Sequence, residues 1–383
     1  MREETLPDGV RIVHSAPTGA DFDPRRPNHV LIYALPNGNN IEHTWGAQLT
    51  PDLDPRFDIQ HVAAQTRLLR RVTPDENIFL VLVEAEGRSW PALRAKRSDN
   101  AALIAAIVKT IRASVPGAPR VTLAAHSGGG SFIFGLINHG EIGGEIDRIA
   151  FLDANYAYDS AQGHGDKLQR WLQGDARRQL VVVAYDDRKI AIDGKLVVGP
   201  DGGTWRASGR MMAHFQKTLP LQTVHGADFD IITAIPGAHP QIALYLHRNP
   251  DNAILHTRLV GEMNGLLMAT TFGTPRQAAW GSFGGPRAYT DFVQATPRVA
   301  LGKKLPNIPP RAADAMGGAQ FLHTIAGLSG EEREAAIAQQ ILAGNVPDFL
   351  RRLRAVTAVG APDSAGVRRQ IVFYAMPDYL AVG

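Results

Sequence analysis

Ala125-His126-Ser127-Gly128-Gly129 follows the apolar run Arg120-Val-Thr-Leu-Ala and precedes Gly130-Ser-Phe-Ile-Phe-Gly-Leu-Ile. This pattern predicts a strand, a tight turn with a serine at its apex, and then a helix. Such a turn forces the serine into a strained backbone region and lifts its hydroxyl clear of the sheet, so the residues two positions away must be small. Ala125 and Gly129 meet that requirement. Ser127 is therefore the candidate nucleophile, and a tightly packed glycine turn without chemistry is the alternative.

Apolar, strand-like runs alternate with helical patterns from about residue 28 to 188. The predicted strands lie at 29–35, 78–83, 120–125, 149–153 and 180–187, and helical spacing of apolar residues is clearest over 100–113. Near-continuous apolar strands that alternate with helices imply an α/β fold with a mostly parallel sheet covered on both faces. Ligands of such sheets bind at the carboxyl ends of the strands. Four candidate polar residues fall there: Ser127, Asp153, Asp186 and Asp187.

The regular alternation ends after residue 188. The pattern there predicts a hairpin over 189–198, a helix over 207–217, and strands near 221–225, 241–247 and 253–260. After Gly273-Thr-Pro the chain becomes rich in glycine and proline. We therefore expect a main domain over 1–275, a Gly/Pro-rich linker over 276–328, and a mostly helical C-terminal extension over 329–383 that ends in a strand. That strand either pairs with the main domain or belongs to a truncated second domain.

Composition excludes several classes of function. The 383 residues contain no cysteine, which removes disulfides, thiolate metal sites and a cysteine nucleophile. The net charge is only +3 and the arginine pairs are scattered, so we expect no nucleic-acid partner. No apolar run approaches the roughly 18 residues of a membrane span. The N-terminus has no apolar segment after its charged residues, so it does not have the pattern of a signal peptide.

Over roughly residues 28–275 the chain resembles the α/β-hydrolase superfamily. The resemblance is carried by Ala125-His-Ser-Gly-Gly, by the strand order around it and by the loop after the first long strand. It implies a serine–acid–histidine triad in that chain order and an oxyanion hole built from two backbone amides. Residues 329–383 are also similar to a region of bacterial proteins that carry a hydrolase domain, and this second resemblance implies no chemistry.

The acid and the base of such a triad have several candidates. A serine hydroxyl needs a hydrogen-bonded base, and the imidazolium that forms needs an anion behind it. Asp187, after the last regular strand, is the preferred acid, with Asp186 or Asp153 as the alternative. His256 and His225 are the candidate bases, His256 slightly preferred. The loop in which the family's histidine is expected carries Met263 and Met268 and no histidine. A third alternative is therefore that the base lies elsewhere in the chain or is absent.

The oxyanion hole needs donors that are fixed before the reaction. The amide of Gly128 is one by geometry, because it follows the nucleophile directly. The second donor is expected in Leu35-Pro-Asn-Gly-Asn-Asn, where Gly38 permits close backbone approach and Asn37 or Asn39 can add a side-chain donor. An ordinary Asn-Gly turn is the alternative. Trp45, Trp90 and Tyr156 could line the cleft, although aromatics at strand ends more often belong to the core.

Together these features predict a serine hydrolase that cleaves carboxylic esters of small or polymeric substrates through an acyl-enzyme. The alternatives are a peptidase or amidase with the same triad, and an inactive binding module that kept the fold. We expect no cofactor and no metal, because the chain has neither a phosphate-binding glycine loop nor a compact set of metal ligands. The sequence does not determine the oligomeric state or the localisation.

Overall fold

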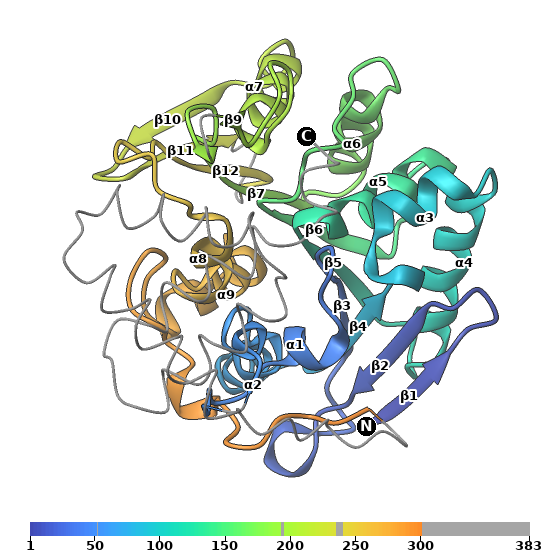
Figure 1. Ribbon diagram of the computed structural model, residues 1–383. Coiled ribbons are helices and arrows are strands. Elements are labelled where there is room, and N and C mark those ends of the chain that lie inside the picture. The colour runs from blue at the N-terminus through green and yellow to red at the C-terminus, as the bar shows by residue number, and fades with distance from the viewer. Residues whose placement is uncertain (52, 193–194, 235–239, 301–383) are drawn as a thin grey trace.

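The computed structural model describes residues 1–300 except 52, 193–194 and 235–239. Within these residues one ten-stranded sheet forms the centre of the molecule, in the order β1-β2-β4-β3-β5-β6-β7-β12-β11-β10 (Figure 1). The strands are β1 (Arg2–Thr5), β2 (Arg11–Ser15), β3 (Asn28–Ala34), β4 (Asn77–Glu84), β5 (Arg120–His126), β6 (Ile146–Leu152), β7 (Gln179–Tyr185), β10 (Leu221–His225), β11 (Phe229–Ala234) and β12 (Ile242–His247). A separate hairpin pairs β8 (Ala191–Ile192) with β9 (Lys195–Leu196).

The centre of the sheet is parallel, from β4 through β3, β5, β6 and β7 to β12. Both outer parts are antiparallel, β1-β2-β4 on one side and β12-β11-β10 on the other. The prediction of an α/β fold with a large, mostly parallel sheet is confirmed. The N-terminal strands and β11 were not predicted.

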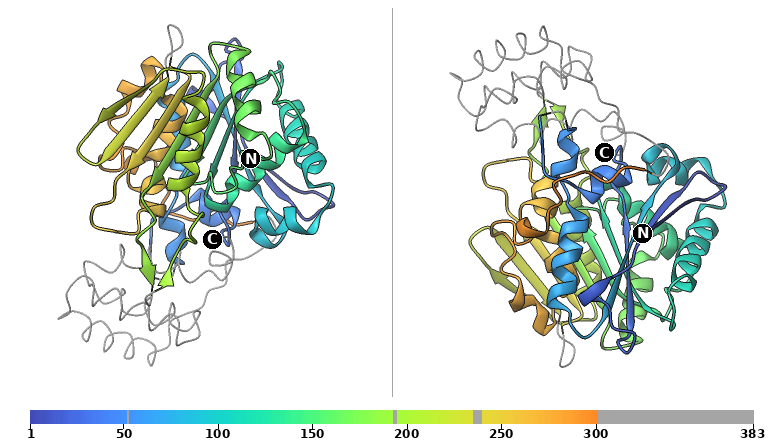
Figure 2. Two further views of the ribbon diagram at one scale, coloured as in Figure 1. Left: turned by 90° about the horizontal axis from the view of Figure 1, so that it is seen from above. Right: turned by 90° about the horizontal axis from the view of Figure 1, so that it is seen from below.

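Helices cover both faces of the sheet (Figures 1 and 2). They are α1 (Ile41–Trp45), α2 (Val62–Val72), α3 (Trp90–Lys96), α4 (Asn100–Ala113), α5 (Gly130–His139), α6 (His164–Gln173), α7 (Thr204–Phe215), α8 (His256–Gly261) and α9 (Gly265–Thr271). One core contains apolar residues of α3 to α7, and the other contains those of α1, α2, α8 and α9. Alternate residues of β5 point to the two cores, Leu123 to the first and Ala124 to the second.

The segment over 253–260 is not the predicted strand. The chain forms helix α8 from His256, with Leu255, Leu259 and Val260 buried against the second core. Positions 255, 259 and 260 share one face of a helix, and this spacing also fits the short apolar run. As a result, His256 lies at the first turn of a helix that packs on β7.

The described part of the predicted linker packs against the main body. Trp280 and Tyr289 are buried in the second core, and Tyr289 donates a hydrogen bond to the carbonyl of Gly261. Arg287 forms an ion pair with Asp58 at 2.7 Å. Residues of 276–300, past the predicted boundary at 275, therefore pack against the main body. The rest of the predicted linker and the predicted C-terminal extension, 329–383, lie outside the described residues.

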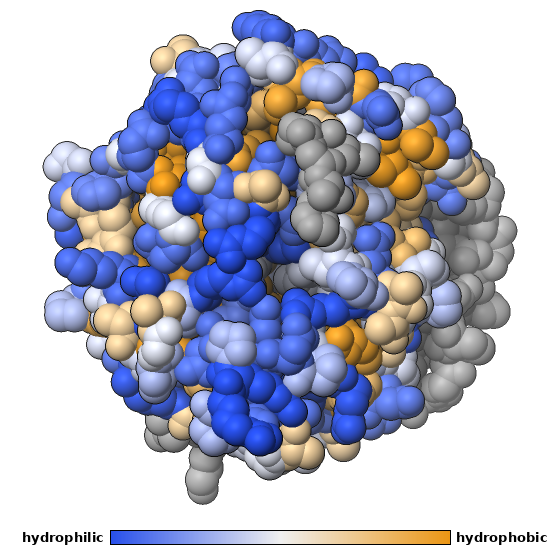
Figure 3. All heavy atoms as spheres, turned by 180° about the vertical axis from the view of Figure 1, so that it is seen from behind, coloured by the Kyte–Doolittle hydropathy of each residue, from blue (hydrophilic) through white to orange (hydrophobic). Residues whose placement is uncertain are grey.

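Apolar side chains do not gather into one large area on the face seen in Figure 3. Hydrophilic residues predominate there, and the apolar ones form small separate patches. No helix within the described part of the chain is long and apolar enough to cross a membrane.

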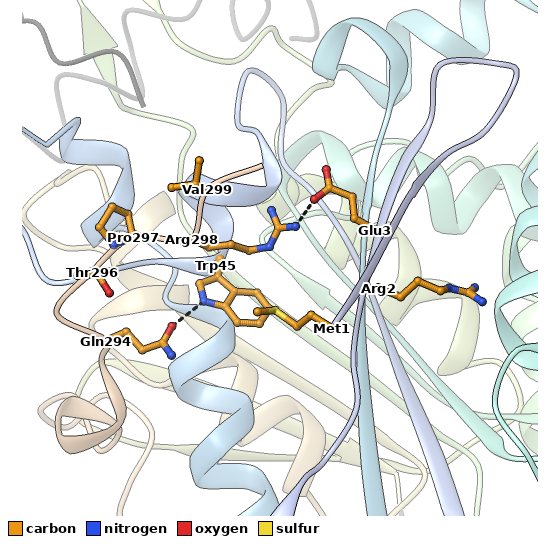
Figure 4. A pocket seen from close by; sticks show the side chains of 9 residues that line it. All are labelled: Met1, Arg2, Glu3, Trp45, Gln294, Thr296, Pro297, Arg298 and Val299. Atoms are coloured by element: carbon orange, nitrogen blue, oxygen red, sulfur yellow. Dashed lines mark hydrogen bonds and ion pairs between the residues drawn. The ribbon is translucent and has the colours of Figure 1, made fainter. Parts of the chain in front are cut away.

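A network of ion pairs joins the N-terminal strands to the segment before residue 300. Arg298 pairs with Glu3 and Glu42, and Arg11 pairs with Glu3, Glu42 and Glu84. Beside this network, a cavity of about 240 Å³ lies next to Trp45, whose Nε1 donates to Gln294 at 3.1 Å (Figure 4). Trp45, one of the aromatic residues predicted to line the cleft, borders this cavity, whereas the candidate catalytic and oxyanion residues do not.

We expect Arg298→Ala to lower the free energy of unfolding by about 3–5 kcal/mol, because it leaves two mostly buried carboxylates without this partner. The matched control is Arg177→Ala. Arg177 also pairs with a carboxylate, that of Asp175 at 2.7 Å, but its side chain is 70% exposed, so its loss should change little. Urea denaturation of both variants makes the comparison. Equal effects would show that the Arg298 network does not hold the two segments together.

Candidate active site

Ser127 occupies the tip of a tight turn between β5 and α5. It begins a single 3-10 turn, Ser127–Gly129, and α5 follows at once. Its φ is 54°, in the left-handed region that a serine rarely adopts. Backbone strain of this kind costs roughly 1–3 kcal/mol and persists only where the surrounding structure enforces it.

The three glycines after Ser127 enforce the turn through close packing. A Cβ on Gly128 would collide with the carboxamide of Asn37, and one on Gly129 would collide with the carbonyl of Ala34. A Cβ on Gly130 would collide with the carbonyl of Ala154. The turn is therefore wedged between the loop after β3 and the loop after β6, which are the loops that follow the two neighbours of β5.

Asp153 and His256 form a buried hydrogen-bonded pair beside this turn. Asp153 follows β6 with a φ of 47°, and its Oδ2 is bonded to Nδ1 of His256. Both side chains are completely buried. The hydroxyl of half-buried Tyr156 lies 3.3 Å from the same Nδ1. Since Nδ1 faces the carboxylate, Nε2 is on the opposite side of the ring.

His126 connects His256 to the serine turn. Its Nε2 lies 3.2 Å from the backbone carbonyl of His256, and because a carbonyl only accepts, this nitrogen carries the proton. The two imidazole rings are 4.4 Å apart between centroids, tilted by 35°. The residue directly before Ser127 thus holds the first residue of α8, which brings His256 next to the turn.

Burial governs the protonation of these groups. It raises the pKa of Asp153, and hydrogen bonds from Thr204 and Tyr156 oppose the rise. Burial also lowers the pKa of His256. The pKa of His126 falls well below its usual value through burial and the nearby His256. Both histidines are therefore neutral at neutral pH, the form in which an imidazole can accept a proton.

Asp187, the preferred acid of the sequence analysis, does not contact His256. Its Oδ2 accepts the backbone N–H of Thr204 at 3.0 Å. Asp153, which was the alternative, holds the histidine instead. Asp186 is turned toward Arg188 and forms an ion pair with it at 2.7 Å. Of the three candidate aspartates, Asp153 is the one hydrogen-bonded to His256, whereas Asp187 accepts the N–H of Thr204 and Asp186 pairs with Arg188.

His225 is far from the serine turn. It ends β10, the outermost strand, and four strands lie between β10 and β5. At a spacing of about 4.8 Å per strand, this is a separation of about 24 Å. Its side chain is 74% exposed and pairs with Asp230 at 2.9 Å. Of the two candidate histidines, His256 is the one that contacts His126, the residue directly before Ser127.

The predicted oxyanion loop lies against Gly128, but its residues differ in what they can donate. The N–H of Gly38 already donates to the carbonyl of Arg88 at 2.8 Å. The carboxamide of Asn37 instead packs directly on Gly128 and is 4% exposed. Within this loop, the Asn37 side chain contacts Gly128, whereas the N–H of Gly38 already has a partner in the carbonyl of Arg88.

Thr204 and His126 are the residues of this site that sequence reasoning missed. Thr204 donates through Oγ1 to Oδ1 of Asp153, the oxygen that does not face His256. Its position after Gly202-Gly203 marks a helix start, but nothing local connects it with Asp153, 51 residues away. No group of three or more potential metal ligands is found in the described part of the chain.

Comparisons with known proteins give only distant likenesses. No protein-family model and no curated protein matches the chain. Among solved structures, the siderophore hydrolase EstB from Aspergillus nidulans is 12% identical, with a TM-score of 0.37. The alignment covers 70% of this chain and 92% of the EstB chain. A thermophilic esterase from Thermogutta terrifontis is 11% identical with a TM-score of 0.31, covering 56% and 78%. A lipase/esterase from Lactobacillus plantarum is 12% identical with a TM-score of 0.28, covering 56% and 84%. At such scores these likenesses carry no conclusion about activity.

Gly130→Ala tests the packing of the turn. Gly130 has a helical φ of −58°, so alanine fits the backbone and only the collision with the Ala154 carbonyl opposes it. We expect a loss of about 3 kcal/mol or more in the free energy of unfolding. Gly209→Ala in α7 is the control, because no atom lies within 4 Å of its added Cβ, and it should be neutral or stabilising by up to about 1 kcal/mol. A harmless Gly130→Ala would contradict the packing described above.

Asp187→Asn tests the burial of this carboxyl. Burial, together with the neighbouring Asp153, raises the pKa of Asp187 to about 7. The unfolded chain then ionises Asp187 before the folded protein does, so its contribution to stability falls as the pH rises from about 4 to about 7. The asparagine variant has no such dependence, because a carboxamide does not titrate. The stability of the wild type relative to the variant should drop by up to about 1.4 kcal/mol per pH unit in this window, and parallel pH curves in urea denaturation would contradict it.

Proposed function

We propose that the chain is a serine hydrolase of the α/β-hydrolase class that cleaves carboxylic esters through an acyl-enzyme. The observation that carries the proposal is the arrangement at the carboxyl end of β5. Ser127 has a φ of 54° at the tip of the turn, and His256, bonded to buried Asp153, contacts the ring of the adjacent His126 with centroids 4.4 Å apart. A nucleophile, a base and an anion are the three groups that this chemistry requires.

The base step follows from the orientation of His256. Nδ1 is committed to Asp153, so Nε2 is the atom that takes the proton from the Ser127 hydroxyl. As Oγ forms a bond to the carbonyl carbon of the ester, His256 becomes an imidazolium. The charge on Asp153 compensates it, and this pairing is strong because both groups are excluded from water.

The negative charge that forms on the carbonyl oxygen needs donors in fixed positions. The N–H of Gly128 is the first, since it directly follows the nucleophile. The carboxamide N–H of Asn37 is the second, and its contact with Gly128 supports this role. Removal of one such donor typically costs 10²–10³-fold in kcat.

The two half-reactions balance without a cofactor. In the first, the carbon–oxygen bond to the alcohol breaks, and the imidazolium returns its proton to the departing alkoxide. In the second, His256 takes a proton from water, the hydroxide attacks the acyl group on Ser127, and the carboxylic acid leaves as Oγ recovers its proton. Esters are favoured over amides because an alkoxide departs more readily than an amine.

Labelling with a fluorophosphonate tests the nucleophile directly. Wild-type protein should form an adduct that peptide mass spectrometry locates on Ser127, and Ser127→Ala should lose both the adduct and p-nitrophenyl ester hydrolysis. Ser160→Ala, a change at an exposed loop position, is the control and should keep both.

His256→Gln should lower kcat about 10³-fold or more, whereas His225→Gln should not. An adduct on another serine, or none in folded wild type, would refute the proposal.

A further inference from the structure

The second oxygen of the Asp153 carboxylate has its own partner. Oδ2 is hydrogen-bonded to Nδ1 of His256, while Oδ1 accepts a hydrogen bond from the hydroxyl of Thr204. Thr204 is the first residue of α7 and is completely buried. A carboxylate with one bonded oxygen can still rotate about its last torsion angle, whereas donors on both oxygens fix its plane.

Thr204 is itself held on both sides of its backbone. Its N–H donates to Asp187 at 3.0 Å, and its carbonyl accepts the hydroxyl of Ser208 at 2.8 Å. The Ser208 hydroxyl in turn accepts Nδ2 of Asn155 at 3.0 Å. The preceding Gly203 has a φ of 87° and lies against the Asp187 carboxylate with no room for a Cβ. The first turn of α7 is therefore locked at the ends of β6 and β7.

We propose that Thr204 is a positioning residue of the active site, and that Asp187 anchors Thr204 instead of serving as the acid. This inference rests on the proposed function. Thr204 sets the plane of the Asp153 carboxylate, and Asp153 then orients the imidazole of His256 toward Ser127. The contacts form one chain that runs from Asp187 through Thr204 and Asp153 to His256.

The surroundings of Asp153 give Thr204 an electrostatic effect as well. The charged or titratable groups that face this carboxylate are Tyr156 from its own loop, His256 from α8 and Asp187 from the loop after β7, with His126 behind His256. Burial disfavours the ionised form of Asp153, and the Thr204 hydroxyl favours it. Without that hydroxyl the pKa of Asp153 would be higher, and less of the enzyme would carry the anion at a given pH.

Thr204→Val is the direct test, because it keeps the shape and the backbone N–H and removes only the hydroxyl. We expect kcat for an ester such as p-nitrophenyl butyrate to fall about 10- to 100-fold, while KM changes less than about threefold. The acidic limb of the kcat/KM profile should move to higher pH. Thr204→Ser keeps a hydroxyl and should recover most of the activity. An unchanged profile in Thr204→Val, or no recovery in Thr204→Ser, would overturn the proposal.

The two aspartates are separated by a matched pair of variants. Asp153→Asn should lower kcat by about 10⁴-fold, as expected for the acid of a triad. Asp187→Asn keeps an oxygen that can accept the Thr204 N–H, so kcat in this variant should fall by less than about tenfold. A loss in Asp187→Asn as large as that in Asp153→Asn would overturn the anchoring role.

NMR of His256 tests the role of Thr204 without substrate turnover, and therefore independently of the proposed hydrolase activity. In ¹⁵N-labelled protein, NMR follows the Nδ1–H proton and the titration of His256. Thr204→Val should lower the pKa of His256 and weaken its bonded proton signal, because Asp153 is ionised less, whereas Thr204→Ser should match the wild type. Unchanged His256 signals in Thr204→Val would refute the role of Thr204 even in an active enzyme. Failure of the wild type to label at Ser127 would refute the hydrolase and leave this comparison intact.

Discussion

The close approach of the turn at residues 127–130 to its two neighbouring loops is the constraint on which the rest of the site depends. The backbone of Gly129 and Gly130 reaches the carbonyls after β3 and β6 because neither residue has a side chain. That contact holds Ser127 at a positive φ and puts Asn37 on one side of it and Ala154 on the other. Asp153 precedes Ala154, so the same contact places Asp153 close to the serine turn. The geometry of the site thus follows from three positions that carry no functional group.

Burial of Asp153 and His256 has an energetic cost that their mutual bond alone does not remove. Each group is completely enclosed, and isolation from water favours the neutral form of both. Donors from Thr204 and Tyr156 compensate in part for the carboxylate. In the proposed mechanism, His256 is neutral before the reaction, and the positive charge that forms on it favours ionisation of Asp153. Exposure would weaken both properties, since water would screen the pair.

The turn could be predicted from the sequence because its pattern is local, whereas the pairing of Asp153 with His256 depends on contacts that no local pattern contains. Asp153 and Asp187 follow adjacent parallel strands and look alike in sequence. Two helices distinguish them in the structure. The first N–H of α7 donates to Asp187, whereas the first residue of α8, His256, is hydrogen-bonded to Asp153. His225 has the expected place in the chain, but the antiparallel pairing of β10 with β11 carries it to the edge of the sheet. Short apolar runs fit either a strand or a helix, which is why α8 was predicted as a strand.

The loop after β3, which carries Asn37, is held in place by ion pairs and hydrogen bonds from outside the site. The carboxylate of Glu84 accepts the N–H of Ile41 at 2.8 Å, directly after this loop, and it also pairs with Arg11 at 3.0 Å. Arg11 and Arg298 join that carboxylate to the N-terminal strands and to the segment near residue 298. On the other side of the loop, Arg56 donates to the carbonyl of Gly38 at 3.3 Å while pairing with Asp54. The helix that follows the loop and the carbonyl at its centre are therefore both held by residues outside the site. Asn37 therefore contacts Gly128 from a loop that is held from outside the site. The oxyanion role proposed for Asn37 requires such support, because a donor that must reorganise during the reaction loses most of its effect.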